Sequence, residues 1–531
     1  MKKNDLVTGK VIDTSFPSTG KVLIDGTDRT ASVKGVIPGQ EVELRLTRTS
    51  VDNTKGELKR IIQKSNIETD SHCPHFCYAG EDGDRCGGCL YQTISYDDEL
   101  QIKEHQIRKL FKKVVPSFDT VFEGITGSDS CDSYRNKMEF TFGNRVIDGS
   151  LELGMHRKGS FYDVVSVPGC RICHPDFGLI VDSTRKYFKD AAFYRKGTHR
   201  GYLRHLLVRR AHFTGQILID LVTADYLPDS WTGELKESER FMPFTDNRGG
   251  LTEDHPPMTS DEKNAENELL AGYVSALRGL DLNGEIVGIL HTRNNSFSDS
   301  VKDQGTEVLF GEDHFFEKLC GLSFKITPFS FFQTNSAGAE KLYGKAGSYL
   351  REALNGEKPA EVFDLYCGTG TITQIISPYA SHVTGVEIVP EAVEAAKENA
   401  AANSITNCDF ICGDVFKVLD SLDKKPDYII VDPPREGLQP KALTKILSYE
   451  VPSIIYIACK PQSLARDIPA FLNAGYEVRR LACVDMFPRT GNAETVCLLS
   501  NRKPDARVKI DVDLEDYYRI KDEQKKNKVS E

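Results

Sequence analysis

Cys459 stands where an apolar run ends and a helix-like stretch begins. It follows the strand-like segment 456–458 and precedes Lys460 and Pro461. A thiol at a strand-to-helix turn is exposed, and an adjacent cation favours the thiolate, which is the nucleophilic form. A buried structural cysteine is the alternative, because free cysteines are among the most buried residues. Taken alone, the residue supports both interpretations.

The segment FDLYCGTG, residues 363–370, has the pattern of a ligand-binding turn between a strand and a helix. Glycines let the backbone turn sharply and approach a ligand closely, with helix N–H groups facing it. Glu387 ends the next strand-like run, 19 residues after Gly368, where a carboxylate can bind both ribose hydroxyls. No third glycine offers a pyrophosphate cradle. S-adenosylmethionine therefore fits better than a dinucleotide.

Two further carboxylates follow strand-like runs. Asp414 comes after the third such run and Asp432 after the fourth. Either alone could be a helix N-cap. At successive strand ends they predict one ligand site, because ligands of open α/β sheets bind at the carboxyl ends of the strands.

Methylation of a pyrimidine carbon would use a cysteine of this kind. C5 of uracil is a poor nucleophile, and thiolate addition at C6 creates an enolate that can attack a methylsulfonium. A base must then remove the C5 proton, so the site needs a second group. Glu494 precedes the final strand-like run. A solvated loop glutamate is its ordinary interpretation, and only the resemblance described below favours a catalytic role.

The elements that would position these residues fall into blocks. From about 326 to 502, apolar strand-like runs alternate with helical stretches, which predicts an α/β domain with a parallel, doubly wound, Rossmann-like sheet. Residues 1–63 alternate as short strands broken by turns, which predicts a small OB-like β-barrel. Between them, 64–325 reads as a mixed, mostly β domain with an amphipathic helix near 96–111. The charged residues 503–531 read as a partly ordered tail.

Charge is unevenly distributed along the chain. The formal net charge is −11, which alone disfavours a polyanionic partner. Residues 131–210, however, carry fifteen Lys and Arg against eight Asp and Glu, whereas 227–270 carry four against eleven. We therefore expect a basic region that can meet nucleic acid and a loop-rich, peripheral acidic insert at 227–270 that faces away from it.

The chain start and the cysteines bear on the compartment. The first residues show no apolar export signal, and no later stretch is apolar for the roughly 18 residues of a membrane helix. We expect a cytoplasmic protein without a membrane contact. The fourteen cysteines are then expected to be thiols, metal ligands or nucleophiles rather than disulfides.

Five segments together resemble the RNA 5-methyluridine (uracil-C5) methyltransferases that act on 23S rRNA and on the tRNA T-loop. The segments, in family order, are FFQTN (331–335), DLYCGTG (364–370), VDPPREGL (431–438), IACKPQSLARD (457–467) and DMFPRTGNAE (485–494). The resemblance spans nearly the whole chain and is nearest to the 23S rRNA enzymes that carry a TRAM domain, an RNA-binding module like the barrel at 1–63.

The resemblance implies roles for individual residues. Cys459 is implied as the covalent nucleophile and Glu494 as the general base. Gln333 and Tyr366 are implied to join the cofactor residues already derived, which are Gly368, Glu387, Asp414 and Asp432. The basic segments 134–143 and 203–210 are implied to contact a folded RNA whose target base is flipped out. We expect a monomer, and no obligate protein partner is evident.

A cysteine-rich loop at 73–89 resembles the family's 4Fe-4S site. The implied ligands are Cys73, Cys86, Cys89 and the distant Cys170, since thiolates on a glycine-rich loop suit such a cluster. The spacing departs from the family, because the first interval is longer and contains Cys77, which is an alternative to Cys73. A structural zinc site, with Cys173 and His174 nearby, and unliganded thiols are the other interpretations.

Other functions stay open on the sequence alone. An exocyclic-amine methyltransferase is disfavoured, because Arg435 stands where an aromatic residue would follow the Pro-Pro turn. A cytosine-C5 enzyme is disfavoured, because no cysteine lies beside that turn. An RNA-binding or folding factor with an unused site is a rival of another class. The sequence does not say which uridine is modified, in 23S rRNA or tRNA, or whether one site or two.

Overall fold

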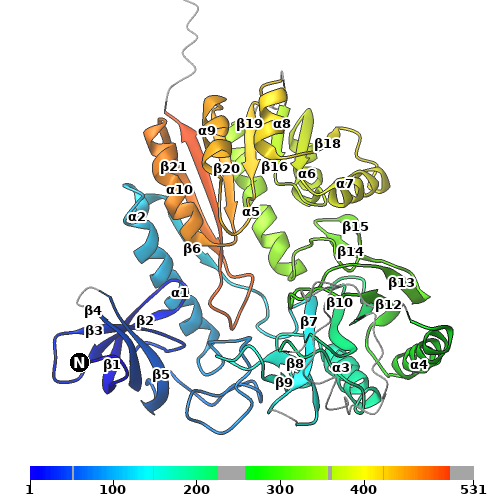
Figure 1. Ribbon diagram of the computed structural model, residues 1–531. Helices are drawn as coiled ribbons and strands as arrows, with labels where there is room; N and C mark the ends of the chain where they lie inside the picture. Colours follow the sequence, from blue (N-terminus) through cyan, green and yellow to red (C-terminus); the bar gives the residue numbers. More distant parts are fainter. Residues whose placement is uncertain are drawn as a thin grey trace, which may run out of the picture.

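The computed structural model describes residues 1–50, 53–146, 149–197, 199–224, 258–356, 361–422 and 424–502. Figure 1 shows three groups of strands: a barrel at the N-terminus, a central sheet, and a C-terminal sheet flanked by helices. The tail at 503–531 and most of the acidic insert, its residues 227–257, lie outside the described residues. Among the helices that are described, none combines the length and the apolar character needed to cross a bilayer.

The N-terminal barrel is closed, with strand order β1-β2-β3-β5-β4. Inward and outward residues alternate along its strands, and Val11, Val22 and Leu44 fill its interior. This is the period-2 pattern expected of a strand with one buried face. The strands are β1 (Leu6–Ser15), β2 (Thr19–Ile24), β3 (Thr30–Lys34), β4 (Glu41–Ser50) and β5 (Asn53–Gln63).

The central sheet has seven strands in the order β13-β12-β11-β10-β7-β8-β9. Helices α3 (Pro175–Tyr187) and α4 (Ser260–Arg278) pack on one of its faces. The strands are β7 (Lys137–Asn144), β8 (Leu151–His156), β9 (Val164–Ser166), β10 (Leu203–Arg210), β11 (Gln216–Thr223), β12 (Glu285–Arg293) and β13 (Thr306–Gly311). A hairpin of β14 (Phe315–Leu319) and β15 (Leu322–Ile326) follows.

The expectation of a loop-rich, peripheral insert is wrong for its last part. Residues 260–270 form the first turns of α4, which starts with a capping box between Thr259 and Glu262. Leu270 is buried in the central core together with Tyr273 and Leu277 of the same helix. The many carboxylates at the start of this segment are compatible with a helix because negative charge is favoured near a helix N-terminus.

The C-terminal sheet has eight strands in the order β18-β17-β16-β19-β20-β22-β21-β6. The five strands from β18 to β20 are parallel, and β22 is antiparallel to both neighbours. The strands are β16 (Glu361–Leu365), β17 (His382–Glu387), β18 (Cys408–Cys412), β19 (Tyr428–Val431), β20 (Ser453–Ala458), β21 (Tyr476–Val484), β22 (Glu494–Asn501) and β6 (Phe122–Thr126).

Helices cover both faces of this sheet. Alternate residues of β20 divide between two cores: Ile454 and Tyr456 belong to one, and Ile455 and Ile457 to the other. The first core includes side chains of α1, α8, α9 and α10, and the second includes α5 and α6. The helices are α5 (Ser336–Leu354), α6 (Thr371–Ile376), the 3₁₀ turn η1 (Ser377–Tyr379), α7 (Pro390–Ala402), α8 (Val415–Ser421), α9 (Pro440–Ser448) and α10 (Pro461–Asn473).

A segment from the N-terminal half of the chain completes this C-terminal layer. Helix α1 (Tyr96–Phe111), expected from its period, contacts β1 of the barrel on one side and α10 on the other (Figure 1). The short α2 (Phe118–Val121) follows, and β6 pairs in parallel with β21. The sequence blocks assign residues 96–126 to the middle of the chain, whereas the structure packs them with the C-terminal sheet, because Ile107 and Phe111 are buried in its core.

Candidate active site and cysteine cavity

The candidate cofactor loop leaves β16 with three residues in the left-handed region. Tyr366 has φ +66°, Gly368 +55° and Gly370 +72°. A side chain at Gly370 would meet Phe410 and Ala396, so glycine is required there both by space and by backbone angle. The turn leads into the start of α6, and Gly368 within it faces Phe331, which is 66% exposed. This leaves the loop accessible to a ligand.

Glu387 lies at the end of β17, where the sequence predicts it, and faces this loop. One carboxylate oxygen accepts a hydrogen bond from the backbone N–H of Gly368 at 3.1 Å. The other accepts from the N–H groups of Ile388 and Val389 at 2.8 and 3.0 Å. These bonds fix the orientation of the carboxylate while leaving acceptor capacity for hydroxyl groups.

The aspartates at the next strand ends differ in their surroundings. Asp414 is exposed and caps α8 by accepting from the N–H of Lys417 at 3.2 Å, so the N-cap interpretation holds for its geometry. Asp432 follows β19, and its backbone N–H donates to the carbonyl of Leu365. Burial, followed by the charge of Asp364, raises the pKa of Asp432 to about 7.

Asp364 is a further candidate that the sequence argument left without a role. Its side chain is fully buried in β16, and Oδ2 accepts a hydrogen bond from Thr373 at 2.5 Å. Oδ1 has no partner among the described residues, and burial raises the pKa of this carboxyl to about 7. The sequence signal for this residue is its place inside the apolar run EVFDL. An ionisable side chain is rarely buried unless it has a partner or a functional role.

Cys459 and Glu494 lie opposite each other at one end of a strand pair. In the antiparallel pairing of β20 with β22, Ala458 is opposite Thr495. Cys459 is the next residue along one strand and Glu494 the next along the other, so the same register sets the two side by side. Glu494 is buried, whereas Cys459 is partly exposed in the turn that leads to α10. The sequence-predicted turn therefore exists, and the thiol is not part of a packed core.

The charges around this pair act on both groups. Burial and then Asp432 raise the pKa of Glu494 to about 8, against the opposing effect of Arg435. Burial, Glu494 and Asp432 raise the pKa of Cys459 to about 11. An adjacent cation was expected to favour the thiolate, but Lys460 is not among the main groups that shift the pKa of Cys459. Its Nζ lies 4.0 Å from Oε1 of Glu436. Arg435 is the cation that lowers the pKa of Cys459, and its effect is the smaller one.

Gln333 joins the site through Tyr343, a residue that the sequence did not single out. Tyr343 is buried on α5, and the side chain of Gln333 acts on its hydroxyl by lowering its pKa. Burial, with the charges of Asp432 and Glu494, raises the pKa of this hydroxyl. The segment that carries Gln333 is tied to the central sheet, because Asn136 Nδ2 donates to the carbonyl of Gln333 at 3.0 Å. Gln333 and Asp432 therefore act on a common neighbour.

The expected RNA surface is partly wrong. Segment 203–210 is β10, an interior strand of the central sheet, and seven of its eight residues are buried. Arg204 donates to the carbonyls of Asn294, Ser296 and Ser298 at 2.7 Å. Arg209 donates to that of Ser330 at 2.6 Å. These arginines hold loops because buried guanidinium groups need carbonyl partners.

A better-exposed candidate surface is the loop between β8 and β9. Phe161 and Tyr162 are 82% and 71% exposed, and neighbouring aromatic residues at that exposure are unusual without a partner. Lys196 Nζ donates to the carbonyl of Phe161 at 2.7 Å, and Arg157 and Lys158 belong to the same loop. Exposed aromatic rings among cations suit stacking on unpaired bases.

The four cysteines of the predicted cluster line one cavity of about 130 Å³. They are Cys73, Cys86, Cys89 and Cys170. Cys77 does not line it and lies against Gly83 instead. Cys173 Sγ lies 3.7 Å from Cys170 Sγ. Within the described ranges, no three His, Cys, Asp or Glu side chains converge as a single metal ion would require. The four thiols share this cavity with His75 and several apolar side chains.

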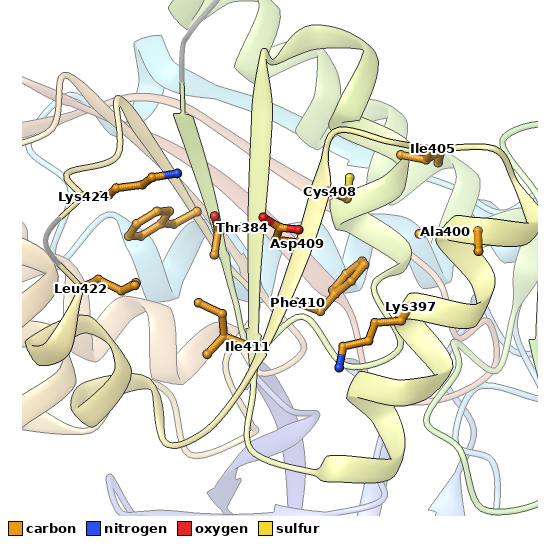
Figure 2. A pocket seen from close by; sticks show the side chains of 12 residues that line it. Thr384, Lys397, Ala400, Ile405, Cys408, Asp409, Phe410, Ile411, Leu422 and Lys424 are labelled. Carbon is orange, nitrogen blue, oxygen red and sulfur yellow. The ribbon is translucent and has the colours of Figure 1, made fainter.

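A larger cavity than the cysteine cavity, with a volume of about 540 Å³, lies elsewhere. It surrounds the edge strand β18, and Figure 2 shows Lys424 and Lys397 on opposite sides of that strand with Asp409 between them. None of the candidate cofactor residues lines it. Cavity size is therefore a poor guide to the site here, and the strand ends that carry the carboxylates are the better one.

Comparison with known proteins identifies the family. Residues 302–502 match a family model described as tRNA (uracil-5-)-methyltransferase. An uncharacterised RNA methyltransferase of Caldanaerobacter subterraneus is 41% identical over 94% of this chain and 99% of its own length. One from Clostridium tetani is 39% identical over 93% of this chain and 98% of its own length.

A solved structure shares the fold. The tRNA (uracil-54, C5)-methyltransferase of Pyrococcus abyssi, in complex with S-adenosyl-L-homocysteine, has a TM-score of 0.64 at 21% identity and covers 92% of this chain and 99% of its own. With the matches above, the chain belongs to the RNA (uracil-5-)-methyltransferase family of S-adenosylmethionine-dependent enzymes.

Proposed function

We propose that this enzyme methylates C5 of uridines in 23S rRNA, with Cys459 as nucleophile and Glu494 as general base. The observation that carries the proposal is the register of β20 and β22, which sets these two residues opposite each other beside Asp432. A nucleophile and a base on facing strands can reach the adjacent atoms C6 and C5 of one pyrimidine ring. The two groups have separate tasks in one reaction.

The chemistry divides into two half-reactions. Cys459 Sγ adds to C6 of the uracil, and the electrons of the C5–C6 double bond move to O4 as an enolate. C5 then takes the methyl group from the methylsulfonium, whose sulfur–methyl bond breaks to leave a neutral thioether. Glu494 accepts the C5 proton, the double bond re-forms and the C6–sulfur bond breaks, which returns the thiolate. A carboxyl with a pKa of about 8 is a strong enough base for this second half near neutral pH.

The cofactor residues are proposed to be Gln333, Tyr366, Gly368, Glu387, Asp414 and Asp432. When bound, S-adenosylmethionine supplies an electrophilic methyl group. The fit is supported by the left-handed turn at Gly368 and by Glu387, whose fixed carboxylate can accept hydrogen bonds from ribose hydroxyls. The unpartnered Oδ1 of Asp364 and the exposed ring of Phe331 at the same loop are consistent with a polar ligand that also has an apolar part.

A 4Fe-4S cluster bound by Cys73, Cys86, Cys89 and Cys170 is part of the proposal. Support comes from the shared cavity and from the donor set, since four thiols with no carboxylate suit iron–sulfur. A structural zinc ion held by thiolates at about 2.3 Å is the alternative occupant of this cavity. The alternative ligand Cys77 is disfavoured because it lies outside the cavity.

The choice of 23S rRNA rests on the resemblance to enzymes that combine a TRAM domain with a cysteine cluster. The closed N-terminal barrel and the cysteine cavity support it. The T-loop uridine of tRNA is the second candidate, favoured by the description of the family model and by the Pyrococcus abyssi structure.

Nucleoside mass spectrometry tests the choice. Both RNAs are isolated from a strain that lacks the enzyme, and each is methylated with purified protein. We expect 5-methyluridine to be missing from 23S rRNA and restored in vitro, with tRNA unchanged. Loss from tRNA alone would make tRNA the substrate. An unchanged 5-methyluridine content in both RNAs would contradict the proposal.

A further inference from the structure

Four charged side chains are buried together where helix α1 meets the loop that precedes Glu494. Lys103 and Glu99 belong to α1, and Asp485 and Arg489 belong to the loop between β21 and β22. Lys103 Nζ lies 2.8 Å from Glu99 and 2.8 Å from Asp485, and all three side chains are fully buried. Arg489 Nη1 lies 3.5 Å from Glu99. Two positive and two negative charges balance, which is the condition for burying them.

The same four residues fix the path of the loop. Lys103 Nζ also donates to the carbonyl of Phe487 at 3.3 Å. Glu99 accepts from the backbone N–H of Arg489 at 2.7 Å. Asp485 accepts from the hydroxyl of Tyr96 at 3.0 Å. The start and the middle of the loop are thus held by α1, which is almost 400 residues away along the chain.

Arg489 adopts a backbone angle that needs such support. Its φ is +69°, which is uncommon for a residue with a side chain. Residues held in sparsely populated backbone regions persist where the surrounding structure over-determines them, and they cluster at functional sites. Here the strained residue lies five positions before Glu494 in the chain.

Arg489 also joins this loop to the segment that follows Cys89. Its carbonyl accepts from the N–H groups of Leu90 and Tyr91 at 2.7 and 3.2 Å. Its guanidinium donates to the carbonyls of Tyr91 and Ile94 at 3.1 and 2.8 Å. Cys89 lines the cysteine cavity, and the next residue, Leu90, hydrogen-bonds the loop that precedes Glu494. The wall of the cavity is therefore linked to this loop.

We infer that Lys103, Glu99, Asp485 and Arg489 are positioning residues, which set Glu494 opposite Cys459 and link its placement to the segment 89–94. The inference rests on the proposed role of Glu494 as base. Cys459 has a second support, because it follows β20, which pairs in parallel with β19 on the side away from β22. Loosening the loop therefore impairs removal of the C5 proton more than addition of the thiolate.

The test separates these two half-reactions. In single-turnover reactions with RNA and S-adenosylmethionine, denaturing gels report the covalent enzyme–RNA adduct, and mass spectrometry reports released 5-methyluridine. The main variant is the double substitution Arg489→Met with Glu99→Gln. It keeps the buried charge balanced, since Lys103 and Asp485 remain, and it keeps a side-chain acceptor for the N–H of residue 489. Lys109→Met, which removes an ion pair between α1 and Asp13 of the barrel, is the matched control.

We expect adduct formation within about threefold of wild type and release slowed at least about tenfold, so that adduct accumulates; the control should match wild type in both rates. Equal losses in formation and release, in step with a lower melting temperature, would overturn the inference, because a merely structural role predicts that result. Unchanged release would overturn it as well.

Two further variants keep the result interpretable. Arg489→Lys retains the charge but cannot reach two carbonyls with one planar group. Should the double variant not fold, this one carries the test, with release slowed at least about threefold and formation unchanged. Glu494→Gln must accumulate adduct in the same assay. If it does not, the proposed function itself fails; if it does and the Arg489 variants release normally, only the positioning inference fails.

Discussion

Two carboxyls and one thiol share the edge formed by β19, β20 and β22, and their environment disfavours negative charge on all three. Asp432 and Glu494 each raise the pKa of Cys459, and burial raises it further, to about 11. At neutral pH the thiol is therefore the resting form. The proposed mechanism therefore requires the thiolate to form in the complex, where the positive charge of a methylsulfonium and of Arg435 would oppose the carboxyls. A resting thiol also limits the reaction of Cys459 with oxidants.

Replacing Cys459 tests whether the nucleophile is used. We expect Cys459→Ser to lower methyl transfer by on the order of 10³-fold or more, because the first bond to C6 is lost. Binding of S-adenosylhomocysteine, measured by calorimetry, should stay within about twofold. Methylation within tenfold of wild type would contradict the covalent route, and it would favour a site whose cysteine is unused.

The pKa of Glu494 predicts a pH dependence for adduct release. Burial and Asp432 raise this pKa to about 8, and a base must be ionised to accept a proton. Release should therefore slow about tenfold for each unit below pH 8 and level off above it. Single-turnover release between pH 6 and 9 measures the profile. A rate that is flat over this range would assign proton removal to another group.

Local patterns predicted whole elements well, and pairing over long distances was not accessible. The period of residues 96–111 and the strand–helix alternation after 326 led to the right elements, since both are set by neighbours in sequence. The place of β6 could not be predicted, because its partner β21 lies more than 350 residues away. The burial of β10 was missed for the same reason, since its neighbours in the sheet decide it.

The candidate site shows the same division. Cys459, Glu387 and the glycine turn were found because each lies at or directly after the end of a strand-like run. The sequence did not predict roles for Tyr343, for Asp364 or for the four buried charged residues that include Lys103. Their surroundings are set by contacts in the folded chain, and the pattern of a single sequence does not contain this information. A lysine on an amphipathic helix is ordinarily a surface residue.

The loop between β8 and β9 makes a prediction for RNA binding. Stacking of a base on an aromatic ring contributes about 1–3 kcal/mol. We expect Phe161→Ala with Tyr162→Ala to weaken RNA binding about tenfold or more, in filter-binding assays at fixed salt, with S-adenosylhomocysteine affinity unchanged. Phe316→Ala, which removes an exposed ring from β14, is the control. Equal affinity for wild type and the double variant would exclude this loop from the RNA interface.

At the scale of the molecule, α1 connects the parts. Its side chains contact the barrel through Gln106, which donates to Thr14, and the C-terminal sheet through Lys103. Tyr134, at the start of the central sheet, donates its hydroxyl to the carbonyl of Pro488 at 2.8 Å. Barrel, central sheet and C-terminal sheet therefore all touch the surroundings of one loop. RNA bound by the barrel and the central sheet would in this way meet the proposed catalytic pair, Cys459 and Glu494, in a defined geometry.

The cysteine cavity also affects the whole molecule, because Cys89 in its wall begins the segment 89–94 that hydrogen-bonds Arg489. Loss of the cluster proposed to fill the cavity should therefore destabilise both the contacts of segment 89–94 with Arg489 and the central domain. We expect Cys73→Ser, purified without oxygen, to lose most of its iron and sulfide and the visible absorbance of a 4Fe-4S cluster. Its melting temperature should fall by several degrees, since binding energy of the group adds to folding stability.

Cys77→Ser is the matched control, because Cys77 lies four residues on and outside the cavity. It should keep wild-type iron, absorbance and melting temperature. The reverse pattern, iron lost from the Cys77 variant and kept in the Cys73 variant, would make Cys77 the first ligand. Stoichiometric zinc without iron in the wild-type protein would replace the cluster by a structural zinc site. Metal analysis of the three proteins, prepared side by side, decides among these outcomes.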